Sequence, residues 1–342
     1  MSTKNKNTNK VAPTELLPFV SICTPTFNRR PFIPFLMKCF EHQTYPKDRM
    51  EWIIIDDGSD PVGDLFEGIP CVKYYHYKER MLLGKKRNVM HSKCGGDIIV
   101  YMDDDDYYPE ERVSHTVETL ESNKDVLIAG SSEMHIYFHD LNKLFQCGPY
   151  GAYHCTAATF AFRKELLLET KYDEEKALAE ETQFLKNYKI PLKQLDTLKT
   201  ILVIAHSHNS CDKKMLLENP EASKVIPSKY SIHEFIENQE LKQFYTRDLH
   251  LLLDSYSLGV PSYKPEVLQQ IEETKASRAK KLQELEKQRT NKNVNVNINK
   301  NKELIDYYEK MVSEKSYLIN ELLKKVKSLS LELEEEKKKS KK

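Results

Sequence analysis

A chain of 342 residues with 39% hydrophobic side chains is long enough for one large domain with an extension, or for two domains. Its 52 basic and 52 acidic residues balance, which excludes a global electrostatic attraction to nucleic acid or to an anionic membrane. No apolar run approaches the roughly 20 residues that a membrane-spanning helix needs. The polar N-terminus lacks the core of a signal peptide, and we interpret residues 1–17 as a disordered leader. The scattered cysteines include no C-x-x-C pair, which favours reduced thiols and a cytoplasmic protein.

Strands alternate with helices in the first third of the chain. Short apolar runs rich in β-branched residues predict strands at residues 19–24, 51–55, 72–77 and 97–102. Apolar residues at helical spacing predict helices at residues 31–43 and 83–93, and Gly95 and Gly96 are expected to close the second helix as a C-cap. This alternation predicts an α/β fold, with a mostly parallel sheet and flanking helices.

Polar side chains directly follow three of these strands, at residues 24–30, 56–59 and 103–106. Ligands of parallel sheets bind outside the carboxyl ends of the strands, so we expect these three clusters to meet there. The third cluster consists of consecutive aspartates, which repel one another strongly unless a divalent cation lies among their oxygens. A solvated acidic turn is the alternative, but the buried strand before the acids favours a metal site.

The α/β pattern continues to about residue 212, which predicts one domain over residues 18–212. We expect a helix after Pro109, a strand at 125–130, a hairpin at 134–145, a Gly/Pro loop at 147–151, a strand at 156–162, helices near 164–170 and 174–187, and a last strand at 201–205.

The C-terminal third has a different character. Residues 213–290 are predicted to form a helical extension, with an amphipathic helix at 232–253 and a charged helix at 264–290. Residues 291–301 are rich in Asn and Lys, and we interpret them as a linker without regular structure. From Ile305 onward, β-branched residues and leucines follow a heptad pattern typical of a parallel two-stranded coiled coil. We therefore predict a coiled coil over residues 302–342 and a homodimer.

Four segments, taken in order, resemble the motifs of the family 2 glycosyltransferases. They are the first strand and turn at 20–29, the second strand and its acids at 53–59, the Gly-Lys-Lys-Arg-Asn sequence at 84–88, and the acidic strand end at 101–109, which resembles a D-x-D metal motif. The resemblance covers about residues 19–211. It implies a GT-A fold, in which a Rossmann-like sheet binds a sugar nucleotide together with a divalent metal.

The resemblance also implies roles for individual residues. Asp103 and Asp105 would be the metal ligands, for Mn²⁺ or Mg²⁺, and Asp104 would face the sugar or the ribose. Asp106 is compatible with a ligand and with the start of a helix. The nucleotide would lie against Thr24, Pro25, Thr26 and Arg29 at the base and ribose, Asp56 or Asp57 at the uracil N3–H, and Lys85 and Arg87 at the diphosphate.

An acidic pair in the second half, Glu180 and Glu181, resembles the general base of the family, whose attack opposite the leaving group would give inversion. Glu181 stands where the family has Asp, and the longer side chain leaves the choice between the two open. A charged helix surface is the alternative interpretation. His206 and His208 should lie on one side of an extended segment and are candidates for the metal or the diphosphate, with a polar loop as the alternative.

The resemblance therefore implies a metal-dependent inverting glycosyltransferase that moves a sugar from a UDP-sugar to a hydroxyl of a glycan or protein acceptor. A sugar nucleotidyltransferase would be expected to carry a Gly-rich basic loop after the first strand, where this chain has Thr-Pro-Thr-Phe-Asn. The third hypothesis is a coiled-coil assembly protein with an inactive transferase-like domain, and the full set of acids argues against it.

Overall fold

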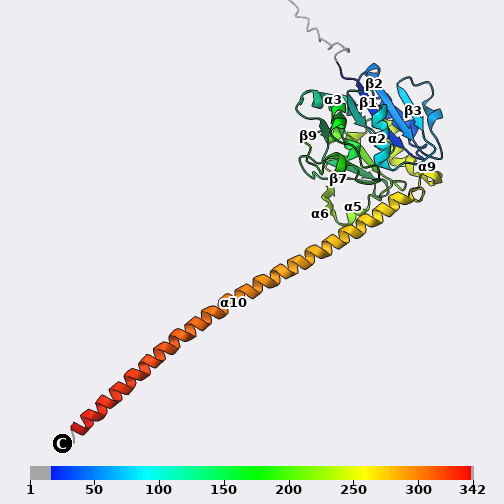
Figure 1. Cartoon of the computed structure of the whole chain (residues 1–342). Coiled ribbons are helices and arrows are strands. Elements are labelled where there is room, and N and C mark those ends of the chain that lie inside the picture. Colours follow the sequence, from blue (N-terminus) through cyan, green and yellow to red (C-terminus); the bar gives the residue numbers. More distant parts are fainter. Residues whose placement is uncertain (1–16, 340–342) are drawn as a thin grey trace, which may run out of the picture. The chain divides into compact units, whose positions relative to one another are not determined.

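The computed structural model describes residues 17–339, without the side chains of residues 282, 286–301, 334–336, 338 and 339. Among these, residues 17–272 belong to one compact unit, and residues 273–339 belong to a second. The strands of the described chain all belong to the first unit, where they form two sheets (Figure 1).

The larger sheet has seven strands in the order β3-β2-β1-β4-β8-β5-β9. They are β1 (Val20–Thr26), β2 (Met50–Asp56), β3 (Val72–His76), β4 (Ile98–Tyr101), β5 (Ile128–Gly130), β8 (Ala161–Arg163) and β9 (Leu192–Gln194). β1 runs parallel to both β2 and β4, β2 is parallel to β3, and β5 to β9, whereas β8 is antiparallel to its two neighbours. The predicted α/β fold with a mostly parallel sheet is therefore confirmed.

Helices pack on both faces of this sheet, because successive side chains of a strand point to opposite sides. The helices of the first half are α1 (Ile33–Glu41), α2 (Leu83–Lys93) and α3 (Arg112–Glu121), close to the predicted ranges. Ile22 and Trp52 are buried in one cluster with side chains of α1, while Ile53 and Ile99 are buried in a second cluster with Met90 of α2. In Figure 1, α2 lies against β1 and β2.

The turn between α2 and β4 needs a glycine because the chain passes very close to β1. A Cβ atom added to Gly96 would lie 2.5 Å from the backbone nitrogen of Ser21. Neither Gly95 nor Gly96 has a positive φ, so the expected glycine C-cap of α2 is wrong. Close packing, and not a left-handed turn, explains the glycine at this position.

The smaller sheet has four strands in the order β10-β6-β7-β11. They are β6 (Met134–Phe138), β7 (Lys143–Cys147), β10 (Leu202–Ala205) and β11 (Val225–Pro227). β6 and β7 form the predicted antiparallel hairpin, and Asn142 adopts the left-handed conformation in its turn. A bridge between Tyr107 and Leu202 joins β10 to the segment that follows β4. The smaller sheet is thereby attached beside the acidic strand end.

The second half contains less helix than predicted. The helix expected at 174–187 is reduced to α4 (Glu181–Phe184), because Ala179 before it and Lys186 after it have positive φ values that end a right-handed helix. The helix expected at 232–253 is divided into α7 (Ile232–Phe235), α8 (Gln239–Gln243), a π-helical turn and α9 (Leu249–Asp254). The strand expected at 156–162 is a 3₁₀ turn followed by the short β8.

Residues beyond 212 complete the same core as the sheets. Two short helices, α5 (Met215–Glu218) and α6 (Pro220–Ser223), come first. Phe235, Leu241, Phe244, Leu249 and Leu253 are then buried in the cluster that includes side chains of β1 and β2. The boundary predicted at residue 212 therefore does not separate two packing units, because the later helices cover apolar surface of the sheets.

The last helix, α10, is a helix of 75 residues (Pro265–Lys339). It continues through residues 291–301, for which we expected no regular structure, because extending a formed helix is far easier than starting one. Further along, the heptad positions Ile305, Val312, Ile319 and Val326 are between 56% and 60% exposed. No helix of the described residues is long and apolar enough to cross a membrane.

Candidate active site

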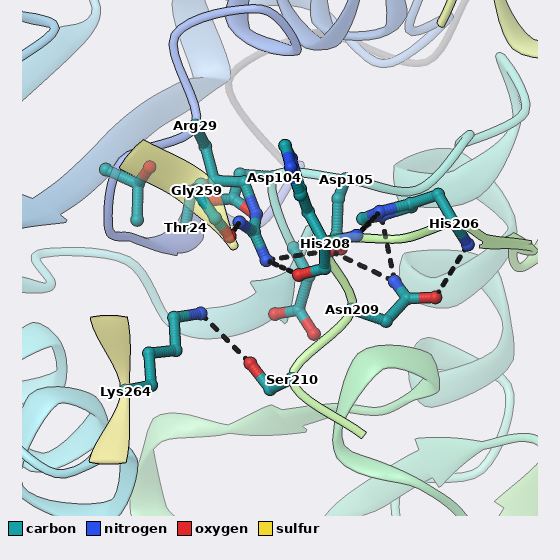
Figure 2. Close-up of polar contacts among 12 residues, drawn as sticks. Thr24, Arg29, Asp104, Asp105, His206, His208, Asn209, Ser210, Gly259 and Lys264 are labelled. Atoms are coloured by element: carbon teal, nitrogen blue, oxygen red, sulfur yellow. Dashed lines mark hydrogen bonds and ion pairs between the residues drawn. The ribbon is translucent and has the colours of Figure 1, made fainter. Parts of the chain in front are cut away.

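The polar segments that follow β1 and β4 meet at the carboxyl edge of the larger sheet. β1 and β4 are neighbours, and the strand order reverses between them, since β2 and β3 lie on the other side of β1. Arg29, after β1, contacts Asp104 and Asp105, after β4 (Figure 2). A reversal of this kind is where parallel α/β sheets bind their ligands.

Arg29 is held in this cluster by the backbone as well as by the acids. Its buried guanidinium has Nε 3.6 Å from Asp104 Oδ1 and Nη2 3.5 Å from Asp105 Oδ2. Nη1 donates to the carbonyl oxygen of Gly259 at 3.0 Å, and Nη2 donates to that of His208 at 2.8 Å. Because the carbonyl contacts are the shorter ones, the guanidinium is fixed mainly by the backbone. Asp104 and Asp105 contact Arg29 at longer distances than these carbonyl oxygens do.

Asp104 and Asp105 differ in their electrostatic environments. Asp105 Oδ2 lies 3.2 Å from His206 Nε2 and 3.5 Å from Asn209 Nδ2. Burial alone would raise the pKa of Asp105, but the hydrogen bond from His206 and the charge of Arg29 outweigh it and hold that pKa below its usual range. Burial raises the pKa of Asp104 to about 7, against the charge of Arg29 and together with that of Asp105. The negative charge is therefore most stable on Asp105.

His206 and His208 do not face the same side. His206 Nδ1 accepts a hydrogen bond from the backbone N–H of His208 at 3.1 Å, so a neutral ring carries its proton on Nε2, toward Asp105. The chain turns after β10, with Asn209 N donating to His206 O at 3.1 Å, and the alternation of an extended segment is lost. His208 instead lies against Gly259, and its Nδ1 has no hydrogen-bond partner among the described residues. The expectation that both imidazoles share one side is wrong.

Arg87 connects the acidic strand end to the acidic pair of the second half. This buried side chain of α2 donates from Nε to Glu180 Oε1 at 2.8 Å, and its Nη2 lies 3.6 Å from Asp103 Oδ1. Burial disfavours the cation, but the charges of Asp103 and Glu180 raise the pKa of Arg87 above its usual value. Arg87 therefore stays charged and joins two carboxylates that are distant in sequence.

Glu180 and Glu181 are neighbours in different environments. Glu180 is 4% exposed and bound to Arg87, whereas Glu181, the first residue of α4, is more exposed and forms no ion pair within the described residues. Burial, followed by the like charge of Glu180, raises the pKa of Glu181 to about 7. A carboxylate with a pKa near neutrality is matched to accept a proton from a hydroxyl group. Of the two glutamates, Glu181 has the properties of a base.

The carboxylate of Asp56 forms hydrogen bonds that hold the surrounding structure together. Asp56 is fully buried. It accepts three hydrogen bonds at 2.8, 3.1 and 2.7 Å, which come from Gly58 N, Val62 N and Tyr74 Oη. These bonds fix the turn after β2 and tie it to β3. Asp56 therefore has little capacity left for a nucleotide base.

Asp57 pairs with Lys86, a residue that the sequence analysis did not select. Lys86 Nζ also donates to Thr26 O at 2.9 Å. Lys85, which was predicted to reach the diphosphate, is exposed to solvent. Helical phase is the signal that could have separated the two lysines, because Lys86 and Arg87 share the buried face of α2 with Gly84.

The residues of β1 that were predicted to contact the nucleotide differ in exposure. The Thr24 hydroxyl donates to Met102 O at 2.6 Å and accepts from Trp52 Nε1 at 2.8 Å. The hydroxyl hydrogen of Thr24 thus forms a hydrogen bond that links β1 to the segment after β4. Thr26 is buried, and Pro25 is half-buried.

Asp106 fastens the smaller sheet to the acidic strand end. Its buried Oδ1 accepts from Ile204 N of β10 at 2.9 Å, and its backbone carbonyl accepts from Tyr245 Oη at 3.0 Å. β10 leads directly into His206. Asp106 does not start a helix, because α3 begins at Arg112. It is a structural connection between the two sheets.

Two further residues of the cluster come from parts of the chain that gave no sequence signal. Asn209 Nδ2 lies 2.8 Å from His206 Nε2 and 3.5 Å from Asp105 Oδ2. Lys264, just before α10, donates from Nζ to Ser210 Oγ at 3.0 Å. Burial, followed by repulsion from Arg29, lowers the pKa of Lys264 to about 7. Neither residue belongs to a recognisable motif, so only the fold reveals that they lie here.

The donor atoms of this cluster suit a hard divalent cation. Carboxylate oxygens are the ligands that Mg²⁺ and Mn²⁺ prefer, and Mg²⁺ is commonly held by one or two carboxylates together with substrate phosphates. Asp103 Oδ1 is buried without a hydrogen-bond partner among the described residues, which leaves that oxygen available to a ligand. Within the same residues, no three His, Cys, Asp or Glu side chains form a ready metal site. A cation here would therefore share its coordination with the substrate.

The part of the chain that contains β1, β2, α2 and the acidic strand end is similar to a known protein family. Residues 21–169 match the profile of the family described as Glycosyl transferase family 2. This segment is a family 2 glycosyltransferase domain. The resemblance seen in the sequence motifs is confirmed for this segment, and Glu181, His206 and Lys264 lie outside it.

Among curated proteins, part of the chain is similar to part of the poly(ribitol-phosphate) β-N-acetylglucosaminyltransferase TarS of Staphylococcus aureus. The two are 26% identical over 119 residues, which is 32% of this chain and 20% of TarS. The chain thus spans about a fifth of the length of this relative.

Two solved structures overlap a larger share of the chain. S. aureus TarS 1–349 in complex with UDP-GlcNAc is 17% identical, covers 67% of this chain and 74% of its own, and has a TM-score of 0.42. The mannosyltransferase PcManGT from Pyrobaculum calidifontis, in complex with GDP-Man and Mn²⁺, is 15% identical, with coverage of 80% and 84% and a TM-score of 0.46.

Proposed function

We propose that this protein is an inverting, metal-dependent glycosyltransferase that moves a sugar from a UDP-sugar to a hydroxyl group of a glycan or protein acceptor. The observation that carries the proposal is the Arg87 bridge, which joins Asp103 to Glu180, the neighbour of Glu181. A site for the leaving group and a base are thereby connected through one side chain. The family 2 domain at residues 21–169 supports the same activity.

The leaving group of this transfer is a nucleoside diphosphate, which departs poorly unless its growing negative charge is neutralised. Asp103 and Asp105 would hold Mn²⁺ or Mg²⁺, which supplies that neutralisation when bound. The hydrogen bond from His206 Nε2 keeps the Asp105 carboxylate oriented. Asp104 is suited to a hydrogen bond with a hydroxyl of the sugar or ribose, because its pKa of about 7 allows it to donate or accept.

Glu181 would act as the general base. It would take the proton from the acceptor hydroxyl while that oxygen forms a bond to the anomeric carbon and the bond to the diphosphate oxygen breaks. Attack opposite the leaving group inverts the configuration of that carbon. Glu180 is bound to Arg87, and burial, followed by the like charge of Glu180, raises the pKa of Glu181. The two glutamates thus have different roles.

Of the two aspartates after β2, Asp57 is the better candidate for the uracil N3–H. It is 5% exposed and lines a cavity of about 80 Å³ together with Phe27, Lys86 and Lys264, whereas Asp56 is fully buried. A carboxylate can accept more than two hydrogen bonds, so its bonds to Lys86 and the backbone leave room for a further donor.

A hollow of about 560 Å³ suits the acceptor. It lies at the carboxyl ends of β5 and β9, and its lining includes Ser132, Tyr150, Gln194, Thr197 and Lys224. β4 and β5 are both antiparallel to β8, so this hollow lies at the same edge of the sheet as the acids. A tyrosine ring beside hydroxyl and amide groups can bind a sugar ring by stacking and hydrogen bonds.

Ring contacts lead from this hollow toward the base. The rings of Tyr150 and His154 lie 4.9 Å apart, and those of His154 and Tyr188 lie 4.7 Å apart. Tyr188 Oη is 3.3 Å from the hydroxyl of Thr182, which follows Glu181. This chain of contacts supports an acceptor that extends from the hollow to Glu181.

Release of UDP from UDP-glucose, UDP-galactose and UDP-N-acetylglucosamine in the presence of Mn²⁺ tests the proposal. We expect turnover with at least one donor and its loss in Asp105→Ala. If the wild-type chain shows neither turnover nor Mn²⁺-dependent UDP binding, the enzyme proposal is wrong and the inactive assembly protein is favoured.

We also propose that α10 pairs with a second copy of the chain as a parallel two-stranded coiled coil. The exposed heptad residues Ile319, Leu322, Val326 and Leu329 support this pairing, because their apolar surface would be buried in a dimer. Deleting residues 302–342 should then halve the mass measured by light scattering. An unchanged mass would refute the coil as the dimer contact.

A cytoplasmic location is a further proposal, supported by the free thiols of all seven cysteines. Titration of unreduced protein from cells should find these thiols unoxidised, and a disulfide in that protein would contradict the location.

A further inference from the structure

We propose that Lys264, which lies outside the family 2 domain, binds a phosphate of the sugar-nucleotide donor and makes the segment at 256–266 part of the donor site. The inference rests on the proposed function, since it requires a nucleoside diphosphate as ligand. It assigns a direct part in donor binding to a segment of the chain that no motif marks.

Lys264 points toward the cluster from the segment that precedes α10 (Figure 2). Its ammonium group donates a hydrogen bond to Ser210 Oγ at 3.0 Å and forms no ion pair among the described residues. It also lies 5.5 Å from the centre of the Phe27 ring. An ammonium group has three donors, so donors remain for a ligand. A half-buried ammonium group without a carboxylate at ion-pair distance in the described chain is costly, and phosphate oxygens would remove that cost.

The neighbouring cations already have carboxylate partners. Arg29 lies beside Asp104 and Asp105, and Lys86 pairs with Asp57. Lys86 and Lys264 line the same cavity of about 80 Å³. Of these three cations, Lys264 is the one without a carboxylate at ion-pair distance in the described chain. A diphosphate next to this cavity would supply the missing negative charge.

The segment around Lys264 is held by contacts that do not involve its ammonium group. Asn28 Nδ2 donates to Leu258 O at 3.0 Å. Arg80 donates to Tyr263 O and forms an ion pair with Glu266. Since these bonds fix the backbone on both sides of the lysine, the charge of Lys264 is not needed to hold the segment in place. A role in ligand binding accounts for the charge at this position.

Comparing the affinities of the full chain for UDP and for uridine distinguishes a phosphate contact of Lys264 from a purely structural role. Affinities are measured with Mn²⁺, by calorimetry for UDP and by NMR titration for uridine. Lys264→Met keeps the length of the side chain and removes its charge. We expect it to weaken UDP binding by about tenfold or more and to change uridine binding by less than about twofold, because a charge-assisted hydrogen bond to phosphate is lost. Lys264→Arg keeps the charge and should retain most of the UDP affinity.

The matched control is Lys171→Met, which changes an exposed lysine of the same compact unit and should bind both ligands as the wild type does. Equal UDP affinity in the wild type and in Lys264→Met would overturn the inference and leave the proposed function intact. Equal losses for UDP and uridine would also overturn it, because they would show that the lysine only shapes the site. If the wild type binds no UDP, the proposed function fails and the inference fails with it.

Discussion

Two acidic strand ends lie at the same edge of the larger sheet, and their carboxylates have very different partners. After β2, Asp56 accepts hydrogen bonds of 2.7, 2.8 and 3.1 Å from its own turn and from β3. After β4, Asp104 and Asp105 lie 3.6 and 3.5 Å from Arg29, and Asp103 Oδ1 has no hydrogen-bond partner among the described residues. A carboxylate saturated by N–H and O–H donors belongs to the framework, whereas one with open oxygens is available to a ligand. The two acidic strand ends are therefore expected to respond differently to substitution.

The largest effect should come from Asp105→Asn. This change removes the most stable negative charge after β4, so we expect UDP release with Mn²⁺ to fall by about 10³-fold or more. The melting temperature should fall as well, because the depressed pKa of Asp105 means that its charge stabilises the folded state, so turnover is compared per folded protein. Turnover at the wild-type rate would show that the acids after β4 are framework as well, and the contrast with Asp56 would disappear.

Glu181→Gln should have the next largest effect on the reaction. Loss of a general base lowers the turnover rate by about 100-fold or more. In the wild type the base must be deprotonated, and its pKa is about 7, so kcat should rise with pH up to about that value and then level off. The residual kcat of the variant should not show this rise with pH. A wild-type profile without an inflection near neutral pH would contradict the assignment.

Although Glu181→Gln should lower the turnover rate, the same substitution should raise the stability of the folded protein at high pH. The pKa of Glu181 lies above its value in an unfolded chain, so the folded state loses stability relative to the unfolded state as pH rises through about 7. Glu181→Gln should therefore melt at a higher temperature than the wild type at about pH 9 and at a similar one at about pH 4. Glu180→Gln, which breaks the bond to Arg87, is the control and should destabilise the protein instead.

A smaller effect, on stability, is expected for Asp56→Asn. The variant leaves buried donors without a good acceptor, so the free energy of unfolding should fall by about 1–3 kcal/mol in urea titrations. Turnover of the folded fraction should stay within about twofold of the wild type. If UDP affinity fell and stability did not, Asp56 would belong to the nucleotide site, as the sequence resemblance allowed.

The smallest effect should come from Lys85→Ala. This lysine is exposed on α2, so we expect a stability change within about 0.5 kcal/mol and an unchanged KM for the donor. Lys86→Ala, one residue further along, breaks the buried pair with Asp57 and should lower the stability and also raise the donor KM, because Asp57 is the proposed uracil contact. A raised donor KM in Lys85→Ala alone would restore the original prediction for this residue.

Much of the fold could be predicted because its signals are local. The range expected for α2 agrees with the observed Leu83–Lys93, and the buried runs before the polar clusters are β1, β2 and β4. Helices of the second half were overestimated, since charged and apolar residues at helical spacing do not reveal the positive φ of Ala179 or Lys186. Apolar periodicity does not report on backbone conformations that end a helix.

The site could be predicted only in part, because its contacts are long-range. The motif order brought Arg29, Asp105 and Glu181 to attention. The saturation of Asp56 depends on Tyr74 from another strand, and Lys264 reaches the cluster from a segment 54 residues after Ser210. Neither contact leaves a pattern in the neighbouring sequence.

The connection made by Asp106 has a consequence for how tightly a donor can bind. Asp106 holds β10 against the end of β4, so Asp105 and His206, which adjoin the two ends of this connection, are brought together by one buried contact. The entropy lost in ordering them is lost when the chain folds, and binding of the donor need not repeat that loss. A change at Asp106 should thus weaken the affinity for the donor without removing any atom that touches it. The cluster is preorganised by a residue that lies outside it.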